Sequence, residues 1–202
     1  MEKRDYKKLL KHLYNPGKKD IVEVDVPAMN YLMIDGQGNP NDSVEYSQAL
    51  EALYLVSYTL KFAVKKGELA IDYGVMPLEG LWWADDMRVF TADNKAAWKW
   101  TMMIMQPDFI TASMVQDAIA NVEKKKNPAA LPLLRFESYA DGKSAQIMHI
   151  GPFSEEGPVI ERLHRHIESV SNLRAKHHEI YLSDIRRAAP EKWKTIIRQP
   201  MA

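Results

Sequence analysis

A glutamate near the carboxyl end of the chain, Glu179, has the neighbours best suited to chemistry. It lies in an alternating run, residues 176–184, that is typical of a strand. Strand alternation turns Glu179 and Tyr181 to one face together with His177, and turns Ile180 to the other face. Such a carboxylate could be a general base whose pKa is raised by burial, or the counter-ion of a cationic ligand. A solvent-facing glutamate on the wet side of a sheet would show the same pattern.

Tryptophans supply a second candidate feature, a wall for a flat ligand. Trp82 and Trp83 are adjacent, so on a strand they face opposite ways and only one of them could share a cleft with Glu179. Trp98 and Trp100 share a face of the next strongly apolar run. Stacked indoles would hold a planar or cationic ligand. Aromatic pairs on strands also pack in protein cores, and the pattern alone does not separate the two uses.

No pattern in the sequence indicates a metal or phosphate site. His164 and His166 are two apart on a predicted helix, and His177 and His178 diverge on a strand, so neither pair shares a face. The sequence has neither a phosphate-binding loop nor a Gly-x-Ser-x-Gly elbow, and it contains no cysteine. We therefore expect no metal, no cofactor and no thiolate chemistry.

Composition and charge narrow the class of partner. The chain has 202 residues, which is enough for one large domain or two small packed ones. Lys+Arg and Asp+Glu both total 27, so the net charge is zero, which argues against a nucleic-acid partner. We found no apolar run of about 18 residues and no secretory signal core, so we expect no membrane span and a cytoplasmic location. We also expect no dedicated protein partner.

The elements that must position these residues are short strands and amphipathic helices. Strands are expected over 21–26, 31–35, 69–73, 80–84, 97–105, 133–139, 143–150 and 176–184, and helices over 1–17, 43–66, 111–126, 154–170 and 189–198. The expected helix caps are Asp42 or Ser43, Thr111 and Ser154. Asp141 and the glycine after it predict a tight hairpin between the strands at 133–139 and 143–150.

Two segments of the chain echo each other. The runs LMIDG at 32–36 and IMHIG at 147–151 each read as a strand and a glycine turn before a helix. Two copies of one strand–helix–strand unit would explain the echo, with a ligand groove at the pseudo-twofold axis. We therefore expect an N-terminal arm over residues 1–20 and one domain over 21–202, built from two pseudo-repeats at about 21–110 and 111–202.

Two motifs resemble a known family. The run HEIYLSD at 178–184, followed by RR at 186–187 and APEK at 189–192, resembles the closing signature of the GyrI-like small-molecule-binding proteins. The run GLWW at 80–83, with DYKK at 5–8 and YNP at 14–16, resembles a stand-alone bacterial branch of that family. The resemblance covers nearly the whole chain. Ile185 stands where the family pattern has proline, outside the expected cleft.

The resemblance implies an α+β fold of two strand–helix–strand–strand modules. It implies an antiparallel sheet with helices on one face and an aromatic ligand groove on the other. It also carries the family's functional glutamate onto Glu179. The residues expected at the site are Glu179 and Tyr139 as catalytic groups, and Trp82, Trp83, Trp100, Tyr181, Met148 and His149 as ligand contacts.

The resemblance also implies a ligand class and a reaction. Relatives such as the multidrug-sensing regulator BmrR bind lipophilic cations around a buried glutamate, which implies a planar hydrophobic or cationic ligand. Some stand-alone members are similar to hydrolases that open the cyclopropane of yatakemycin- and duocarmycin-type genotoxins. In that case Glu179 would activate a water for ring opening, in detoxification. The alternatives are a non-catalytic multidrug-binding or sequestering protein, and a DNA gyrase inhibitor, which the neutral charge disfavours.

Overall fold

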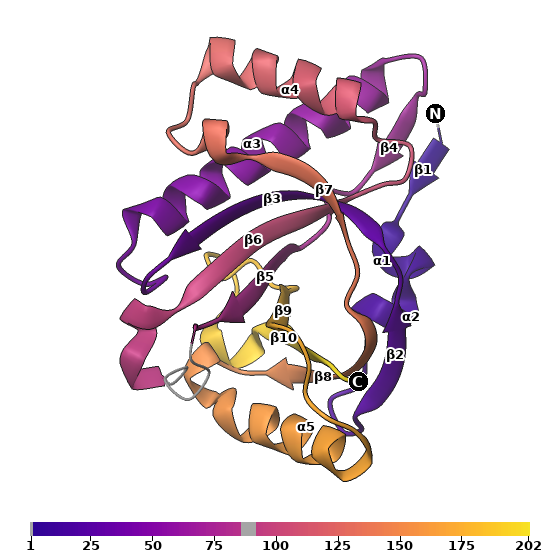
Figure 1. Ribbon diagram of the computed structural model, residues 1–202. Helices are drawn as coiled ribbons and strands as arrows, with labels where there is room; N and C mark the ends of the chain where they lie inside the picture. Colours follow the sequence, from indigo (N-terminus) through magenta and orange to yellow (C-terminus); the bar gives the residue numbers. More distant parts are fainter. Residues whose placement is uncertain (1, 86–91) are drawn as a thin grey trace. The chain divides into compact units, whose positions relative to one another are not determined.

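The computed structural model describes residues 2–85 and 92–202 and has the α+β fold that the sequence predicted (Figure 1). The chain divides into two units, each assembled from separate stretches. The first comprises Met1–Tyr6, Met29–Met76 and Trp83–Tyr139, and the second comprises Lys7–Ala28, Pro77–Trp82 and Ala140–Ala202. The predicted division into repeats between residues 110 and 111 stays a prediction.

The first unit contains an antiparallel sheet, two long helices and a small parallel strand pair. Its elements are β1 (Glu2–Arg4), β3 (Met29–Gln37), α3 (Val44–Lys66), β4 (Ile71–Tyr73), η2 (Ala92–Ala97), β6 (Lys99–Gln106), α4 (Ala112–Lys125), η3 (Leu131–Leu133) and β7 (Arg135–Tyr139). β3 lies between β6 and β7 and is antiparallel to both, while β1 pairs with β4 in parallel. The helices α3 and α4 pack side by side, and α3 lies along β3 and β6 (Figure 1).

Capping side chains determine where the two helices of the first unit begin. The Ser43 hydroxyl accepts a hydrogen bond from the Tyr46 backbone N–H at 3.1 Å, and the Thr111 hydroxyl accepts one from Met114 at 3.3 Å. These bonds satisfy amide groups that the first turn of a helix leaves without a partner. Gly67 follows the last residue of α3. The predicted caps of both helices are confirmed.

The second unit is built around a five-stranded antiparallel sheet. Its elements are α1 (Tyr6–Leu9), α2 (Lys11–Tyr14), β2 (Val22–Val26), β5 (Leu78–Trp83), β8 (Gly142–Ile150), η4 (Phe153–Glu155), α5 (Gly157–Val170), β9 (His177–Tyr181), η5 (Pro190–Lys192) and β10 (Lys194–Pro200). Tyr6 and Trp83, at the ends of α1 and β5, belong to the first unit. The strand order is β2-β8-β10-β9-β5. The segment β8–α5–β9–β10 has the predicted strand–helix–strand–strand order.

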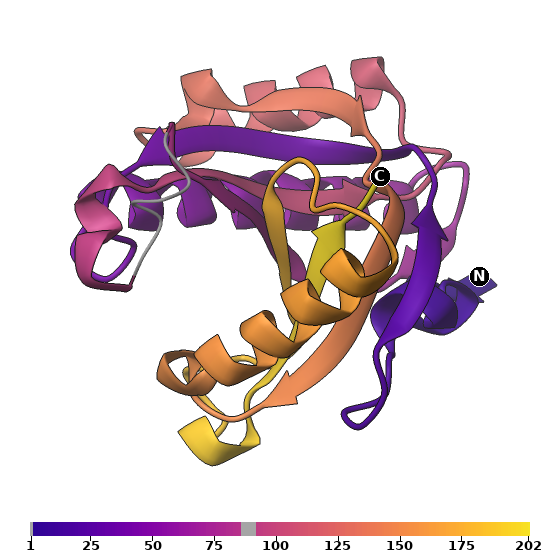
Figure 2. The ribbon, with the colours of Figure 1, turned by 60° about the horizontal axis from the view of Figure 1, so that its bottom comes forward.

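The core of the second unit lies between α5 and one face of this sheet. Leu163 and Ile167 of α5 pack with Ala145 and Ile147 of β8 and with Ile197 of β10. Figure 2 shows α5 lying across these strands. The apolar residues of α5 are three or four apart, and those of the strands are two apart, as each element needs in order to bury one face.

The tail of the chain is the clearest departure from the sequence prediction. Residues 189–198 were expected to be helical, but Pro190 starts only the single turn η5, and β10 follows it. β10 is a central strand, paired with β8 on one side and β9 on the other. Its run of β-branched residues, Thr195, Ile196 and Ile197, suits a strand that is buried on both faces. Non-local pairing therefore overrides the local helix signal.

Three further local predictions were wrong. The 133–139 and 143–150 strands do not form a hairpin, because β7 pairs with β3 and β8 pairs with β2 and β10. Ser154 lies in η4, and α5 begins at Gly157 with a proline in its first turn. Residues 2–14 form β1 and two single-turn helices and not one helix. In each case the local sequence pattern did not determine which element forms or with which strand it pairs.

A close approach in the first unit gives a test of this packing. A Cβ atom added at Gly36 would lie 2.2 Å from ring atoms of Trp100, its cross-strand partner on β6. Trp100 is buried and cannot move away, so Gly36→Ala should lower the free energy of unfolding by about 1–3 kcal/mol. Chemical denaturation measures this change. Gly74→Ala is the matched control, since nothing lies within 4 Å of its added Cβ. Equal stability of the two variants would contradict the described packing.

Candidate functional site

Both carboxylate oxygens of Glu179 have hydrogen-bond partners on its own strand. His177 Nε2 lies 3.0 Å from Oε1, and the Tyr181 hydroxyl donates to Oε2 at 2.7 Å. The Trp82 indole N–H donates in turn to the Tyr181 oxygen at 2.9 Å. The Glu179 side chain keeps 14% of its surface exposed. It is therefore a held but reachable carboxylate, flanked by His177 and Tyr181 as strand alternation predicted.

Strand register explains how a tryptophan reaches this carboxylate. Gly80 of β5 is the direct cross-strand partner of Glu179, and Trp82 pairs with His177. Directly opposed residues of antiparallel strands share a face. Because Gly80 has no side chain, the Trp82 and Tyr181 side chains can meet across this position. Trp82 is thus the tryptophan that faces Glu179, and strand alternation turns the next residue, Trp83, the other way.

The face that carries Glu179 differs from the expected one. We expected the ligand groove on the sheet face opposite the helices. On β10, Ile197 is the cross-strand partner of Glu179, and Ile197 packs under α5. The His164 ring of α5 lies 6.5 Å from the His177 ring. Glu179 therefore shares its face with α5.

The pKa of Glu179 also differs from expectation. Burial acts to raise the pKa, as predicted, but the hydrogen bond and charge of His177 act against it. The hydrogen bond from Tyr181 and the charge of His178 lower it further, and the net shift is downward. Glu179 is therefore a carboxylate at neutral pH, and His177 Nε2 is assigned as a donor to it.

Two aromatic residues that the sequence reasoning did not place at the site extend this face. The Phe153 ring meets the Tyr181 ring edge-on at 5.7 Å, and the Trp193 ring lies 5.0 Å from Phe153. Phe153 is 38% exposed. Phe153 lies in the single turn η4 and Trp193 directly follows the single turn η5, where no periodicity marks a buried or binding face, so the strand and helix patterns could not reveal them.

A second polar cluster lies behind β9 and is fully buried. His178 Nδ1 is 2.6 Å from Asp141 Oδ2, and His178 Nε2 is 2.9 Å from Glu79 Oε2. Arg198 lies 3.4 Å from the same Asp141 oxygen and donates to Gln146 at 2.9 Å. We call Glu79, Asp141, His178 and Arg198 the buried cluster. The sequence predicted an apolar face here because Ile180 lies on the same face as His178. The polar partners of His178 come from distant parts of the chain, so the pattern around His178 does not reveal them.

His178 must carry a positive charge in this arrangement. Both of its partners are carboxylates, which only accept, so both ring nitrogens have to donate. Burial acts to lower the pKa of His178, but the charges and hydrogen bonds of Asp141 and Glu79 outweigh it and raise the pKa to about 9. With His178 charged, two carboxylates face two cations and the buried cluster is neutral.

The remaining predicted site residues lie in several places. His149 of β8 is in register with Thr195, which pairs with Tyr181, so His149 shares the face of Glu179. Met148 faces the opposite way. In the first unit, Tyr139 ends β7, with its ring 6.4 Å from that of Tyr31. The roles of all these residues in ligand binding stay predictions.

Trp100, which was predicted to line the cleft, lies on the α3 side of the first unit. Its ring meets the Tyr46 ring of α3 edge-on at 5.3 Å. It also helps to line a small pocket of about 140 Å³ with Asp35, Glu45 and Gln48. The part of Trp100 in ligand binding stays a prediction.

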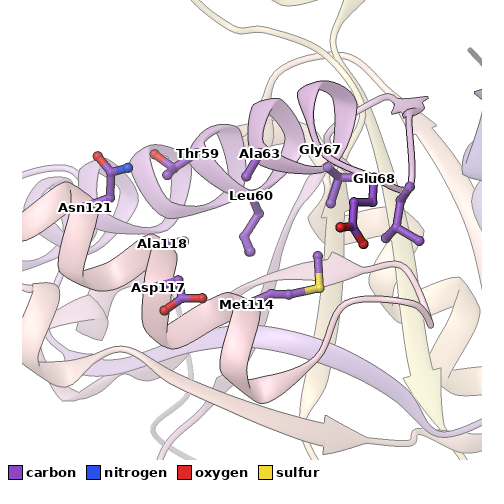
Figure 3. A pocket seen from close by; sticks show the side chains of 11 residues that line it. Thr59, Leu60, Ala63, Gly67, Glu68, Met114, Asp117, Ala118 and Asn121 are labelled. Atoms are coloured by element: carbon purple, nitrogen blue, oxygen red, sulfur yellow. The ribbon is translucent and has the colours of Figure 1, made fainter.

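A larger hollow lies between α3 and α4 (Figure 3). Its volume is about 360 Å³, and no predicted site residue lines it. Leu60 and Ala63 of α3 line it with Met114 of α4, and Glu68 and Asp117 supply carboxylates. Across residues 2–85 and 92–202, no group of three or more His, Asp or Glu side chains is arranged to hold a metal ion. No helix in the same part of the chain is long and apolar enough to cross a membrane.

The raised pKa of His178 gives a prediction for stability. A pKa raised above the unfolded value of 6.5 stabilises the fold fully below about pH 6.5, and this contribution is lost as the pH rises through about 9. The rise corresponds to roughly 3 kcal/mol of unfolding free energy. Chemical denaturation between pH 6.5 and the alkaline range should show the loss.

Matched variants isolate this contribution from other groups that titrate at alkaline pH. His178→Gln should be less stable near neutral pH and should lack the alkaline loss. His166→Gln, at a partly exposed histidine beside Glu23, should keep it. An alkaline loss of the same size in His178→Gln would show that another group is responsible.

Comparison with known proteins places the chain in a family. Residues 19–201 match the GyrI-like small molecule binding domain. A hydrolase from Listeria innocua is 40% identical, with a TM-score of 0.87, and the alignment covers 100% of both chains. A further crystal structure described as a hydrolase from Listeria innocua is 38% identical, with a TM-score of 0.83, covering 98% of this chain and 99% of that one.

A more distant likeness concerns the fold alone. The C-terminal domain of EcmrR is 12% identical, with a TM-score of 0.56, and the alignment covers 91% of this chain and 97% of that one. None of the curated proteins matched the sequence. Because the GyrI-like match spans most of the chain, and the two Listeria proteins are similar over its whole length, the protein belongs to the GyrI-like small-molecule-binding family.

Proposed function

We propose that the protein binds flat hydrophobic small molecules at the Glu179 face and hydrolyses a strained electrophilic ring in them. The proposed substrates are cyclopropane-bearing genotoxins of the yatakemycin and duocarmycin type, and the proposed role is detoxification. Two observations support this: the chain's similarity to two Listeria innocua hydrolases, and the held carboxylate of Glu179 among aromatic side chains. The second carries the proposal, because it supplies a group that can act on water.

Glu179 is suited to hold a water molecule. Each carboxylate oxygen has two lone pairs, and the bonds from His177 and Tyr181 use one on each oxygen. A water could donate to either remaining lone pair. Its oxygen would then point away from Glu179, toward a ligand that rests on Tyr181 and Phe153. Positioning of this kind accelerates reactions by removing the entropy cost of bringing the reactants together.

The proposed reaction is an addition of water. The water oxygen forms a bond to the ring CH₂ as the cyclopropane C–C bond breaks. The electron pair of that bond moves through the dienone and makes its oxygen a phenolate. The water proton passes to Glu179 and then to the phenolate, so that water is added overall. Relief of ring strain and formation of the aromatic ring drive the step.

The lowered pKa of Glu179 limits what it does in this scheme. A weaker base removes less of the water's proton early in the reaction. The main role of Glu179 is therefore to orient the water and to accept its proton as the C–O bond forms. A strained electrophile tolerates a weak base, because the ring itself supplies much of the driving force.

The same observation favours a second candidate, non-catalytic binding of lipophilic cations. An ionised carboxylate beside Trp82, Tyr181 and Phe153 offers both a counter-charge and aromatic faces for a cation. This protein would sequester its ligand unchanged.

Substitution of Glu179 tests the catalytic proposal. Glu179→Gln keeps the shape of the side chain and removes its charge, so turnover of a duocarmycin-type cyclopropane should fall by about 10²–10⁴-fold. Binding of the neutral compound should remain, as measured by fluorescence quenching of the tryptophans. Mass spectrometry follows the water adduct. Glu23→Gln, at an exposed glutamate of the same unit, is the matched control and should keep parental turnover.

The outcomes separate the two candidates. Multiple turnovers by the wild type, lost in Glu179→Gln, support the hydrolase. The sequestering protein is supported if the wild type binds at most one equivalent of the compound and leaves it unchanged, and if Glu179→Gln binds a lipophilic cation more weakly. Parental turnover in Glu179→Gln would remove Glu179 from the mechanism.

A further inference from the structure

We infer that the buried cluster behind β9 positions Glu179: it locks the strand in register and keeps a fixed positive charge next to that carboxylate. The inference rests on the proposed function, in which Glu179 is the group that meets the ligand. It assigns a role to Glu79, Asp141, His178 and Arg198, none of which touches the ligand in that proposal. They are therefore positioning residues and not catalytic ones.

The first step is the way in which His178 holds β9. Its two ring nitrogens bond to carboxylates on two different segments, Glu79 of β5 and Asp141 just before β8. A ring tied at both ends cannot rotate, and the backbone that carries it is fixed between two anchors. Glu179 is the next residue. The register that brings Gly80 opposite Glu179, and so makes room for Trp82, is held by the same bonds.

The second step is charge balance. Arg198 is wholly buried and has three partners: Asp141, Gln146 and the Leu13 carbonyl. Its charge alone would leave one of the two carboxylates uncompensated, since Glu79 and Asp141 are both buried. A protonated His178 completes the balance. A buried charge without compensation is strongly unfavourable, so the cluster keeps His178 charged near neutral pH.

The third step is the covering of the cluster by residues 12–14, which we call the seal because it keeps water from the cluster. The Tyr14 hydroxyl donates to Glu79 Oε1 at 2.7 Å, and Arg198 donates to the Leu13 carbonyl at 2.8 Å. Gln146 donates to the His12 carbonyl at 2.9 Å. Leu13 and Tyr14 are themselves buried. Residues 12–14 precede the stretch matched by the GyrI-like family, so this chain supplies the seal from outside that stretch.

The fourth step is the effect on Glu179. His178 and Glu179 are adjacent, with side chains on opposite faces of β9, so a cation fixed by two hydrogen bonds lies behind the carboxylate on the reverse face of the strand. The groups facing His178 are Glu79, Asp141, Arg198 and, through Glu79, Tyr14. Those facing Glu179 are His177 and Tyr181, with Trp82 beyond Tyr181 and His164 beyond His177. Of the two cations on the reverse face, Arg198 and His178, the one adjacent to Glu179 in the chain is His178, and its charge acts to lower the pKa of Glu179.

Reciprocal coupling gives a test that leaves the buried cluster intact. If the charges of His178 and Glu179 interact, removal of either must shift the titration of the other by the same amount. NMR of the imidazole ring in the full chain follows His178, and ¹³C-labelled glutamate carboxyl groups report Glu179. In Glu179→Gln the His178 midpoint should fall by about one pH unit, the size expected for unit charges separated by several ångströms. In Glu23→Gln it should not move.

The reverse variant completes the cycle. His178→Gln should raise the titration midpoint of Glu179 by a similar amount, whereas His166→Gln should leave it in place. If the cluster served stability alone, these substitutions would lower the melting temperature without moving the titration midpoint of either His178 or Glu179. An unmoved His178 midpoint in folded Glu179→Gln therefore overturns the inference, even where His178→Gln fails to fold.

The titrations also separate this inference from the proposed function. They need no substrate, so coupled midpoints support the positioning role even if no cyclopropane compound is turned over. Turnover without coupling would keep the hydrolase and overturn the positioning role. In an active protein, His178→Gln should in addition move the acid limb of the pH–rate profile to higher pH, and His166→Gln should leave it in place.

Discussion

The carboxylate of Asp141 accepts hydrogen bonds from two cations, His178 and Arg198, at a point that solvent does not reach. Such an arrangement tolerates no missing member, because removal of one partner leaves a buried charge that costs about 3–5 kcal/mol. Its members come from β5, β9, β10 and the residue before β8, so the charges can pair only when these strands are correctly ordered. A buried ion cluster is weak support for stability as such, but these charges are paired in the register that places Gly80 opposite Glu179.

That constraint separates the two faces of β9. On one face, Glu179 is held by His177 and Tyr181 and remains partly exposed. On the other face, His178 is closed off by residues 12–14 and by two carboxylates. One strand thus carries a reachable anion and a sealed cation in consecutive positions. The alternation of strand side chains, which is the simplest property of β structure, is what places the two charges back to back.

Alternation and capping are also where the sequence was most informative. The faces of β9 and the caps Ser43 and Thr111 depend on neighbours within a few residues, whereas the strand–helix–strand–strand order from β8 to β10 was implied by the family resemblance. The failures depend on distant partners. β10 is a strand because β8 and β9 lie on both sides of it, and nothing in residues 189–198 reveals them. Asp141 is a strong turn residue, but its carboxylate is used by His178, 37 positions away.

The site shows the same division. That Glu179 and Tyr181 share a face could be predicted because they lie two apart on one strand, but the sequence left open whether Trp82 or Trp83 joins them. Glu79 and Phe153 could not be predicted, because their relation to Glu179 exists only after folding. The pKa of Glu179 was predicted in the wrong direction for a related reason. Burial follows from an apolar neighbourhood and can be estimated from sequence, whereas donor geometry and a cation on the reverse face cannot.

The lowered pKa bears directly on the kind of ligand that the site suits. A carboxylate held by two donors and backed by a fixed cation gives up part of its basicity, and in return it keeps its charge and its direction at any pH near neutrality. Abstraction of a proton from an unreactive substrate needs a stronger base, so that class of reaction fits poorly. Two classes fit well: capture of a cation on aromatic faces, and orientation of water toward an electrophile that strain has already activated. Both use the same geometry, and they differ only in whether the bound molecule offers an electrophilic carbon to the water. A single site of this kind could therefore serve binding in one family member and hydrolysis in another without a change in its charged groups.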